Sequence, residues 1–227
     1  MGRSVHSLPI MLLTAALVAC QMPAATAGDV PALIDPGRNA GAAPAHFDFL
    51  PAGREGRTEW TLVEDPTAAG GFAIEQRGAA ASHSLAIYKP ASLKNADISL
   101  RIKATRGAED RAGIALRLAG SDNYYLVRLD APKQQVLFSR VTNGLEEEIV
   151  GVDADIATNA WRRLAVRATE NEFVVTLDGV WMFTAFDKAI PHAGRIALWS
   201  AAASTTRFDS ITIAPLSNPE PAMMTRP

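Results

Sequence analysis

Apolar and polar residues alternate with a period of two along most of the chain between residues 46 and 214. Such alternation is typical of strands that bury one face, because successive side chains of a strand point to opposite sides. Gly, Asn, Asp, Ser and Pro separate the alternating segments, and no stretch of ten or more residues has a helical stripe. The pattern predicts fourteen strands, near residues 46–50, 58–64, 71–77, 83–89, 96–105, 111–119, 123–131, 134–142, 145–152, 161–168, 172–178, 180–186, 194–200 and 206–214.

Short strands separated by turns at this spacing predict an all-β fold, an antiparallel two-sheet sandwich of the jelly-roll type. The chain has 227 residues, of which 48% are hydrophobic, and this is enough for a sizeable core. We expect one domain over residues 45–214, because nothing in the middle of the chain is typical of a linker. Residues 28–44, rich in Ala, Gly and Pro, are predicted to be a flexible tether, and residues 215–227 a disordered tail.

Two dipeptides typical of two-residue hairpin turns set the expected strand register. Asp178-Gly179 predicts that Leu177 lies opposite Val180 and that Val175 lies opposite Met182. Asn143-Gly144 predicts an Arg140–Glu147 cross-strand ion pair, with Phe138 opposite Ile149.

A third hairpin is predicted to turn through residues 120–123 and to pair Ala119 with Tyr124. Its inner face would then be apolar throughout, with Leu118 opposite Tyr125, Leu116 opposite Val127 and Ile114 opposite Leu129. A slip of one residue would bury two arginines, so we expect the register to be well determined. The outward face would carry Arg117, Tyr124, Leu126 and Arg128.

This outward face is the predicted ligand site. Sugar sites combine an aromatic ring, which stacks on the C–H face of a pyranose, with planar donors for the hydroxyl groups, and Tyr124 with Arg117 and Arg128 supplies both. Arg101 joins the site if Ile98, Leu100 and Ile102 face the core. The alternative is that these long cations only solvate a sheet face and cover apolar surface with their stems. Among the tryptophans, we expect Trp161 and Trp181 in the core, with Trp199 as a lesser ligand candidate.

The first 27 residues are typical of an export signal. Arg3 precedes an apolar run from Pro9 to Ala19, which is too short to cross a bilayer core of about 30 Å. Leu17-Val18-Ala19-Cys20 resembles a lipobox, in which Cys20 would be lipidated and would attach the protein to a membrane. Ala25-Thr26-Ala27 is an alternative signal-peptidase site. We therefore expect a periplasmic or outer-membrane lipoprotein, or else a secreted protein, without an internal disulfide because Cys20 is the one cysteine.

The charges are nearly balanced, with 22 Lys and Arg against 24 Asp and Glu and a formal net charge of −2. This balance does not favour a nucleic-acid partner. We expect a monomer.

Several segments resemble known families. Residues 160–166 (AWRRLAV) and 177–179 (LDG) resemble the laminin-G-like pattern. Residues 112–117 (AGIALR) and 123–128 (NYYLVR) are similar to the 3-keto-disaccharide hydrolase domain family, as is the closing segment 207–213 (RFDSITI). Both families have the concanavalin A-like fold. The chain departs from the hydrolase pattern at Arg111-Ala112-Gly113, in its opening stretch, and in the acidic middle stretch.

The resemblance implies an exported carbohydrate-binding jelly roll, with hydrolysis of 3-keto-glycosides as its enzymatic form. The laminin-G likeness implies the alternative, a non-catalytic module that holds envelope proteins or peptides. It also implies Ca²⁺ as a cofactor, with Asp209 as the candidate ligand, although an aspartate there can simply begin or turn a strand.

No catalytic residue can be named from the sequence. The Glu-x-Asp-x-x-Glu motif of related glucanases is absent, and the run 146–148 (EEE) is typical of a solvated hairpin end. Asp153 and Asp155 are weaker candidates for Ca²⁺ binding or catalysis. His46, His83 and His192 are isolated and lack zinc-site spacing.

Overall fold

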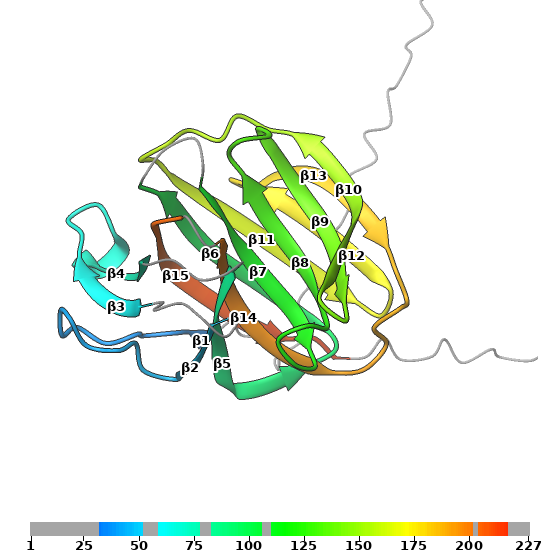
Figure 1. Ribbon diagram of the computed structural model, residues 1–227, viewed down its shortest axis with the longest axis horizontal. Coiled ribbons are helices and arrows are strands. Elements are labelled where there is room, and N and C mark those ends of the chain that lie inside the picture. Colours follow the sequence, from blue (N-terminus) through cyan, green and yellow to red (C-terminus); the bar gives the residue numbers. More distant parts are fainter. Residues whose placement is uncertain (1–31, 52–58, 78–82, 106–109, 202–203, 218–227) are drawn as a thin grey trace, which may run out of the picture.

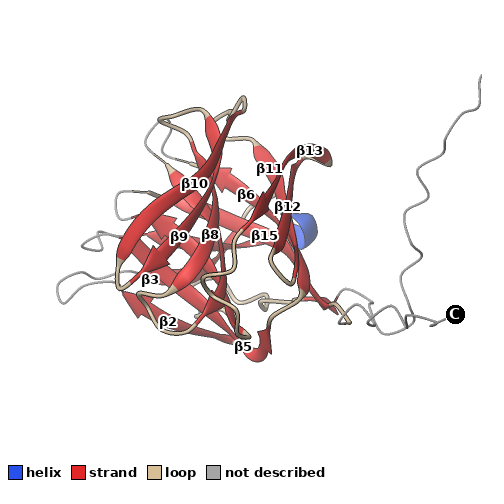
Figure 2. Ribbon diagram, turned by 90° about the vertical axis from the view of Figure 1, so that its right-hand side faces the viewer, coloured by secondary structure: helices blue, strands red, loops and turns tan. Residues whose placement is uncertain are grey.

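The computed structural model describes residues 32–51, 59–77, 83–105, 110–201 and 204–217. These residues form two antiparallel sheets that pack face to face, as the views in Figure 1 and Figure 2 show. Sheet A has the strand order β13 (Val180–Phe186), β12 (Glu172–Leu177), β11 (Trp161–Thr169), β6 (Ala96–Ala104), β15 (Thr206–Pro215), β4 (Phe72–Arg77) and β3 (Glu59–Glu64), with β1 (Ala32–Leu33) also pairing β15. Sheet B has the order β10 (Leu145–Asp153), β9 (Gln135–Thr142), β8 (Tyr124–Asp130), β7 (Arg111–Leu118), β14 (Gly194–Ala201), β5 (His83–Leu93) and β2 (Phe47–Pro51).

The architecture confirms the predicted fold class, an all-β, antiparallel two-sheet sandwich of the jelly-roll type. Each of the fourteen predicted strands is present, and their ends agree within one residue, except that β5 continues to Leu93. The sequence pattern missed β1 and one turn of 3₁₀ helix, η1 (Ala69–Gly71), because both are too short to show a period.

The core fills the space between the two sheets. At its centre lie the rings of Tyr125, Phe138 and Phe173, whose centroids are 4.7–5.5 Å apart. All three side chains are fully buried. At this separation aromatic pairs gain attraction beyond their area burial, so these rings help to hold sheet B against sheet A.

The predicted tether is ordered over the part that the structure describes. Residues 32–33 pair with β15, and the Gly41 N–H donates to the Leu62 carbonyl at 2.8 Å. Ile34 is only 6% exposed. The tether prediction is therefore wrong for residues 32–44, because short turns between backbone contacts leave no periodic pattern in the sequence. Residues 28–31, the signal segment with Cys20, and residues 218–227 lie outside the described residues.

β-Bulges changed the hairpin registers. Leu177 lies opposite Val180 and Arg140 lies opposite Glu147, as predicted, but a bulge in each hairpin shifts the later pairs. Val175 therefore lies opposite Phe183, and Phe138 lies opposite Val150.

The third hairpin is shifted by two residues from the prediction. Leu116 pairs with Tyr125 and Ile114 with Val127. A shift of two keeps the paired residues up to Leu116 on their predicted faces, since the side-chain period is also two, but Arg117 and Leu118 lie beyond the paired segment. Among the described residues no helix is long and apolar enough to cross a membrane.

Candidate functional site

The outer face of sheet B carries a second apolar cluster, separate from the core. Its ten members are buried: Leu85, Ile87, Ala115, Leu118, Tyr124, Leu126, Val141, Ala197, Trp199 and Ala201. Two hairpin turns meet beside this face, where the Gly144 N–H donates to the Asp122 carbonyl at 2.9 Å and the Asn143 N–H to Asn123 Oδ1 at 3.1 Å. A hollow of about 370 Å³ remains, here called the sheet B pocket, lined by His83, Arg111, Tyr124, Arg128, Val141, Gly144, Glu146, Trp199 and Ala201.

Gly113 creates the space at the centre of this face. It lies between two strands, opposite Arg128 of β8 and opposite Trp199 of β14. A Cβ atom at this position would lie 2.0 Å from the Val127 carbonyl oxygen and 2.8 Å from Arg128 Cβ, which only glycine avoids. Across the vacant position the Arg128 guanidinium reaches over the Trp199 ring, at 5.8 Å from its centroid.

Charged side chains form a row along one side of the pocket. Arg128 donates to Glu146 through Nη1, and its Nη2 lies 3.5 Å from Asp130 Oδ2. Arg111 Nε lies 3.3 Å from the same Asp130 oxygen. Arg128 Nε is buried and makes no hydrogen bond to any described residue, although Asp130 Oδ2 is 3.5 Å away. The row thus combines opposed charges with a buried donor that the described residues leave without a hydrogen bond.

The rings of His83, Tyr124 and Trp199 form the aromatic floor of the pocket, and they pack against one another. The His83 ring stacks on Trp199 with centroids 5.7 Å apart, and His83 Nε2 lies 3.1 Å from the Tyr124 hydroxyl. Tyr124 is only 1% exposed, so its ring offers no face to a ligand. The predicted stacking role of Tyr124 is therefore wrong. The Trp199 N–H is also buried and, within the part of the chain that the structure describes, makes no hydrogen bond of normal geometry.

Burial sets the protonation states of this floor. It lowers the pKa of His83 below 6.5, which the nearby Glu146 charge and a hydrogen bond to the Ser121 backbone partly oppose. Burial also raises the pKa of Tyr124 to about 12, against a weaker opposite effect of Trp199. At neutral pH the floor is therefore an uncharged imidazole beside an uncharged phenol.

Arg117 does not belong to this pocket, and its predicted outward placement is wrong. It lies at a bulge of β7 with a φ of +50° and is 1% exposed. Its guanidinium turns inward and donates to three backbone carbonyls: Lys94 at 3.1 Å, Ile190 at 2.9 Å, and Glu170. The bulge also moves Leu118, which was predicted to face the core, into the outer cluster.

Arg101 lies on the outer face of the other sheet. Its Nε donates to Asp209 Oδ1 at 2.7 Å, and its guanidinium lies 5.0 Å from the centroid of Trp161. Trp161 is therefore outside the core, contrary to prediction, and so is Trp181, which is 63% exposed at the sheet edge. Arg101 thus belongs to a structural ion-pair group and takes no part in the sheet B pocket.

A second set of ion pairs lies beside Arg101. Asp65 accepts hydrogen bonds from Lys103 at 2.5 Å, from Thr67 at 2.6 Å and from Arg207 at 2.9 Å. Burial alone would raise the pKa of the Asp65 carboxyl, but these donors outweigh burial and hold the pKa well below its usual range. Glu75, also buried, pairs with Arg207 at 2.6 Å.

Asp209 does not fit the predicted calcium site. Arg101 occupies both of its oxygens, and the Ala69 N–H donates to Oδ2 at 2.7 Å. Calcium needs six to eight oxygen ligands. Within the described residues, no three His, Cys, Asp or Glu side chains are grouped to hold a metal ion.

Of the predicted ligand residues, the structure brings Tyr124 and Arg128 together in the sheet B pocket. Trp199, the lesser candidate, joins them. Sequence reasoning missed four further residues that line or support the pocket: His83, Arg111, Asp130 and Glu146. Strand parity could have found Arg111 and Asp130, since both share the outward face of the predicted hairpin, whereas His83 and Glu146 arrive from separate strands.

No protein-family model matches the chain, and no curated protein matches it. Solved structures share its fold. Carbohydrate-binding module CBM66 from Bacillus subtilis has a TM-score of 0.59 at 21% identity, covering 70% of this chain and 94% of that module. A galectin-like-fold protein from Bacillus subtilis has a TM-score of 0.55 at 7% identity, with 73% and 91% covered. Domain 4 of the arabinanase AbnA from Geobacillus stearothermophilus, solved with arabinotriose, has a TM-score of 0.51 at 12% identity, with 70% and 82% covered.

Proposed function

We propose that this chain binds a carbohydrate in the sheet B pocket. The observation that carries the proposal is a pair of buried donors beside the pocket, Arg128 Nε and Trp199 Nε1, that make no hydrogen bond within the described residues. A buried donor without a partner costs roughly 1–3 kcal/mol, and a ligand hydroxyl would remove this cost. Two of the solved structures that share the fold are named as a carbohydrate-binding module and as a domain in complex with arabinotriose, which supports the choice of ligand.

The charges of the pocket favour a neutral sugar. Two guanidinium groups, Arg111 and Arg128, face two carboxylates, Asp130 and Glu146, while His83 is uncharged. Vicinal hydroxyls can donate to a carboxylate and accept from a guanidinium at the same time. The volume of about 370 Å³ is near the lower end of the range of roughly 300–1,000 Å³ for small-molecule pockets. We therefore expect a single sugar or the end unit of a longer glycan.

The site favours binding over hydrolysis. A glycosidase needs two carboxyl groups with access to the scissile bond, one of them as general acid. Here Asp130 Oδ2 and Glu146 Oε1 pair with arginines, and Asp130 Oδ1 accepts from the Lys133 N–H at 3.2 Å. The hydrolase reading and the laminin-G-like reading stay predictions from the sequence. We also propose export of the chain, supported by the signal-like segment 1–27 with its lipobox-like Cys20.

A glycan array of mono- and oligosaccharides, followed by calorimetry with the best ligand, tests the proposal. Glu146→Gln keeps the shape but removes the charge of a side chain that is 37% exposed, so folding should be retained. Arg128→Met removes the guanidinium. We expect each variant to lose at least about tenfold in affinity, since hydrogen bonds to charged groups contribute about 1.5–3 kcal/mol.

Arg163→Met is the matched control. Arg163 is exposed on sheet A and donates only to Ser99 Oγ among its side-chain partners in the described chain, so wild-type affinity is expected. Wild-type affinity in both pocket variants, or no sugar bound at millimolar concentration, would overturn the proposal.

A further inference from the structure

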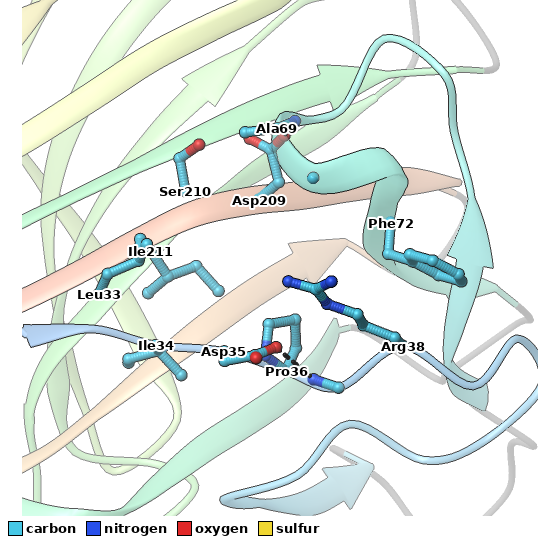
Figure 3. A pocket seen from close by; sticks show the side chains of 12 residues that line it. Leu33, Ile34, Asp35, Pro36, Arg38, Ala69, Phe72, Asp209, Ser210 and Ile211 are labelled. Carbon is cyan, nitrogen blue, oxygen red and sulfur yellow. Dashed lines mark hydrogen bonds between the residues drawn. The ribbon is translucent and has the colours of Figure 1, made fainter.

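A second pocket lies on sheet A, away from the proposed sugar site. It is bounded by the segment that follows β1, by η1, and by β15, as Figure 3 shows. Its volume is about 270 Å³. We call it the sheet A pocket, and its lining residues are Leu33, Ile34, Asp35, Pro36, Gly37, Arg38, Ala69, Gly70, Phe72, Asp209, Ser210 and Ile211.

A break in strand pairing produces this pocket. Along one edge, β15 pairs with β4 only as far as Phe208 and with β1 only from Thr212 onward. Between them Ser210 has a φ of +48° and forms a bulge. The Ile34 N–H, which donates to the Ile211 carbonyl at 2.9 Å, holds the segment after β1 across the gap. The hollow is therefore built from fixed backbone.

The walls of the sheet A pocket are mostly apolar. Leu33 is 69% exposed beside it, although it belongs to a strand. Phe72 is half-buried at the opposite wall, and Ile211 and Ile34 close the base. Exposed apolar side chains that converge on a hollow are typical of a ligand site, because water gains little from contact with them.

One cation reaches into these apolar walls. Figure 3 shows the Arg38 guanidinium extending across the pocket between Phe72 and Pro36. Within the described residues Arg38 has no ion-pair partner. The two nearby carboxylates are bonded elsewhere. Both Asp209 oxygens accept from Arg101, and Asp35 Oδ1 accepts from the Gly37 N–H at 2.9 Å within the local turn. The pocket therefore offers a guanidinium to a ligand.

We propose that the sheet A pocket binds a small amphipathic anion, with a carboxylate or sulfonate on Arg38 and an apolar body against Leu33 and Phe72. A planar guanidinium holds such groups through two parallel hydrogen bonds. The volume admits a short acyl chain or a fused ring system but not a folded partner.

Fluorescence of 1-anilinonaphthalene-8-sulfonate, which joins an apolar ring system to a sulfonate, is the first probe of the full chain. Octanoate should displace it, whereas 1-octanol of the same chain length should do so at least tenfold less well, because it lacks the charge. Arg38→Gln should weaken octanoate binding about tenfold and remove the preference over octanol. Leu33→Ser should weaken both ligands.

Two control variants separate this site from the other one. Arg167→Gln changes an exposed sheet A arginine that pairs with Asp97, and should bind octanoate like wild type. Arg128→Met should also bind octanoate normally, even where sugar binding is lost. Equal displacement by octanol and octanoate, or unchanged octanoate binding in Arg38→Gln, would overturn the proposal. So would loss of octanoate binding in Arg128→Met, which would place the probe in the sheet B pocket.

Discussion

Arg117 provides the sharpest test of how the sandwich is held together. Its guanidinium joins three separate connections, β5–β6 at Lys94, β11–β12 at Glu170 and β13–β14 at Ile190. The same group lies 5.0 Å from the Phe173 ring centroid and 5.8 Å from that of Tyr125. Burial lowers the pKa of Arg117, which Tyr125 and Glu170 oppose. Desolvation thus offsets part of what the hydrogen bonds contribute.

Replacing Arg117 by Met keeps the apolar stem and removes all three hydrogen bonds. Each contributes about 1.5–3 kcal/mol because the donor is charged. Part of this loss is offset, because Met has no desolvation cost and because water can reach the half-exposed carbonyls. We expect a net loss of about 3 kcal/mol. The left-handed φ at this position strains Met and Arg alike, so the comparison isolates the guanidinium.

Urea unfolding followed by circular dichroism measures this change directly. A loss of about 3 kcal/mol corresponds to a fall in Tm of roughly 6–12 °C for a domain of this size. The stability of Arg117→Lys should lie between those of wild type and Arg117→Met, since one ammonium cannot reach all three carbonyls. Sugar affinity of the folded Arg117→Met protein should equal that of wild type. A stability loss below about 1 kcal/mol, or lost sugar binding in a fully folded variant, would refute this account of Arg117.

Four further predictions follow from buried groups and from the chain start. Gly113→Ala should cost at least about 3 kcal/mol in urea unfolding, because its Cβ would overlap the β8 backbone; an unchanged midpoint would contradict the geometry. As pH falls below about 4, stability should decrease because the Asp65 pKa is depressed on folding, and Asp65→Asn should flatten this acid limb. As pH rises from about 10 to 12, stability should fall by roughly 2–3 kcal/mol for each of Tyr124 and Tyr125, whose pKa values are raised to about 12, which urea unfolding at each pH measures. Cys20→Ala should release the protein from membranes on fractionation if the lipobox is used, and should change nothing if cleavage follows Ala27.

Strand positions were predictable because a half-buried sheet imposes a two-residue period that the sequence records directly. Departures of the backbone from that period were not predictable from the sequence. Arg117 and Ser210 have positive φ values, yet neither is a glycine that would indicate it. The bulge at Arg117 reverses the faces of Arg117 and Leu118, so an arginine expected outside lies inside. Parity arguments fail wherever a bulge goes unrecognised.

The sheet B pocket was half predictable for a related reason. Arg128 and Tyr124 come from one hairpin, and the order of residues within a strand determines that they share a face. His83 and Glu146 come from strands 41 and 18 residues away from Tyr124 and Arg128, and only the three-dimensional strand order brings them together. The prediction that Arg101 joins this site was wrong for a different reason. That a residue faces away from the core does not determine which of the two sheets it belongs to.

The short strand β1 places the first described residues on sheet A. Ala32 pairs with Ile213, and nearby the Leu216 N–H donates to the Asn95 carbonyl at 3.1 Å, so both ends of the described chain lie on sheet A. The sheet B pocket lies on the outer face of the other sheet. A domain immobilised through either end would therefore present this pocket outward, to ligands arriving from solution. A fluorescent protein or purification tag fused at either end should leave sugar binding intact.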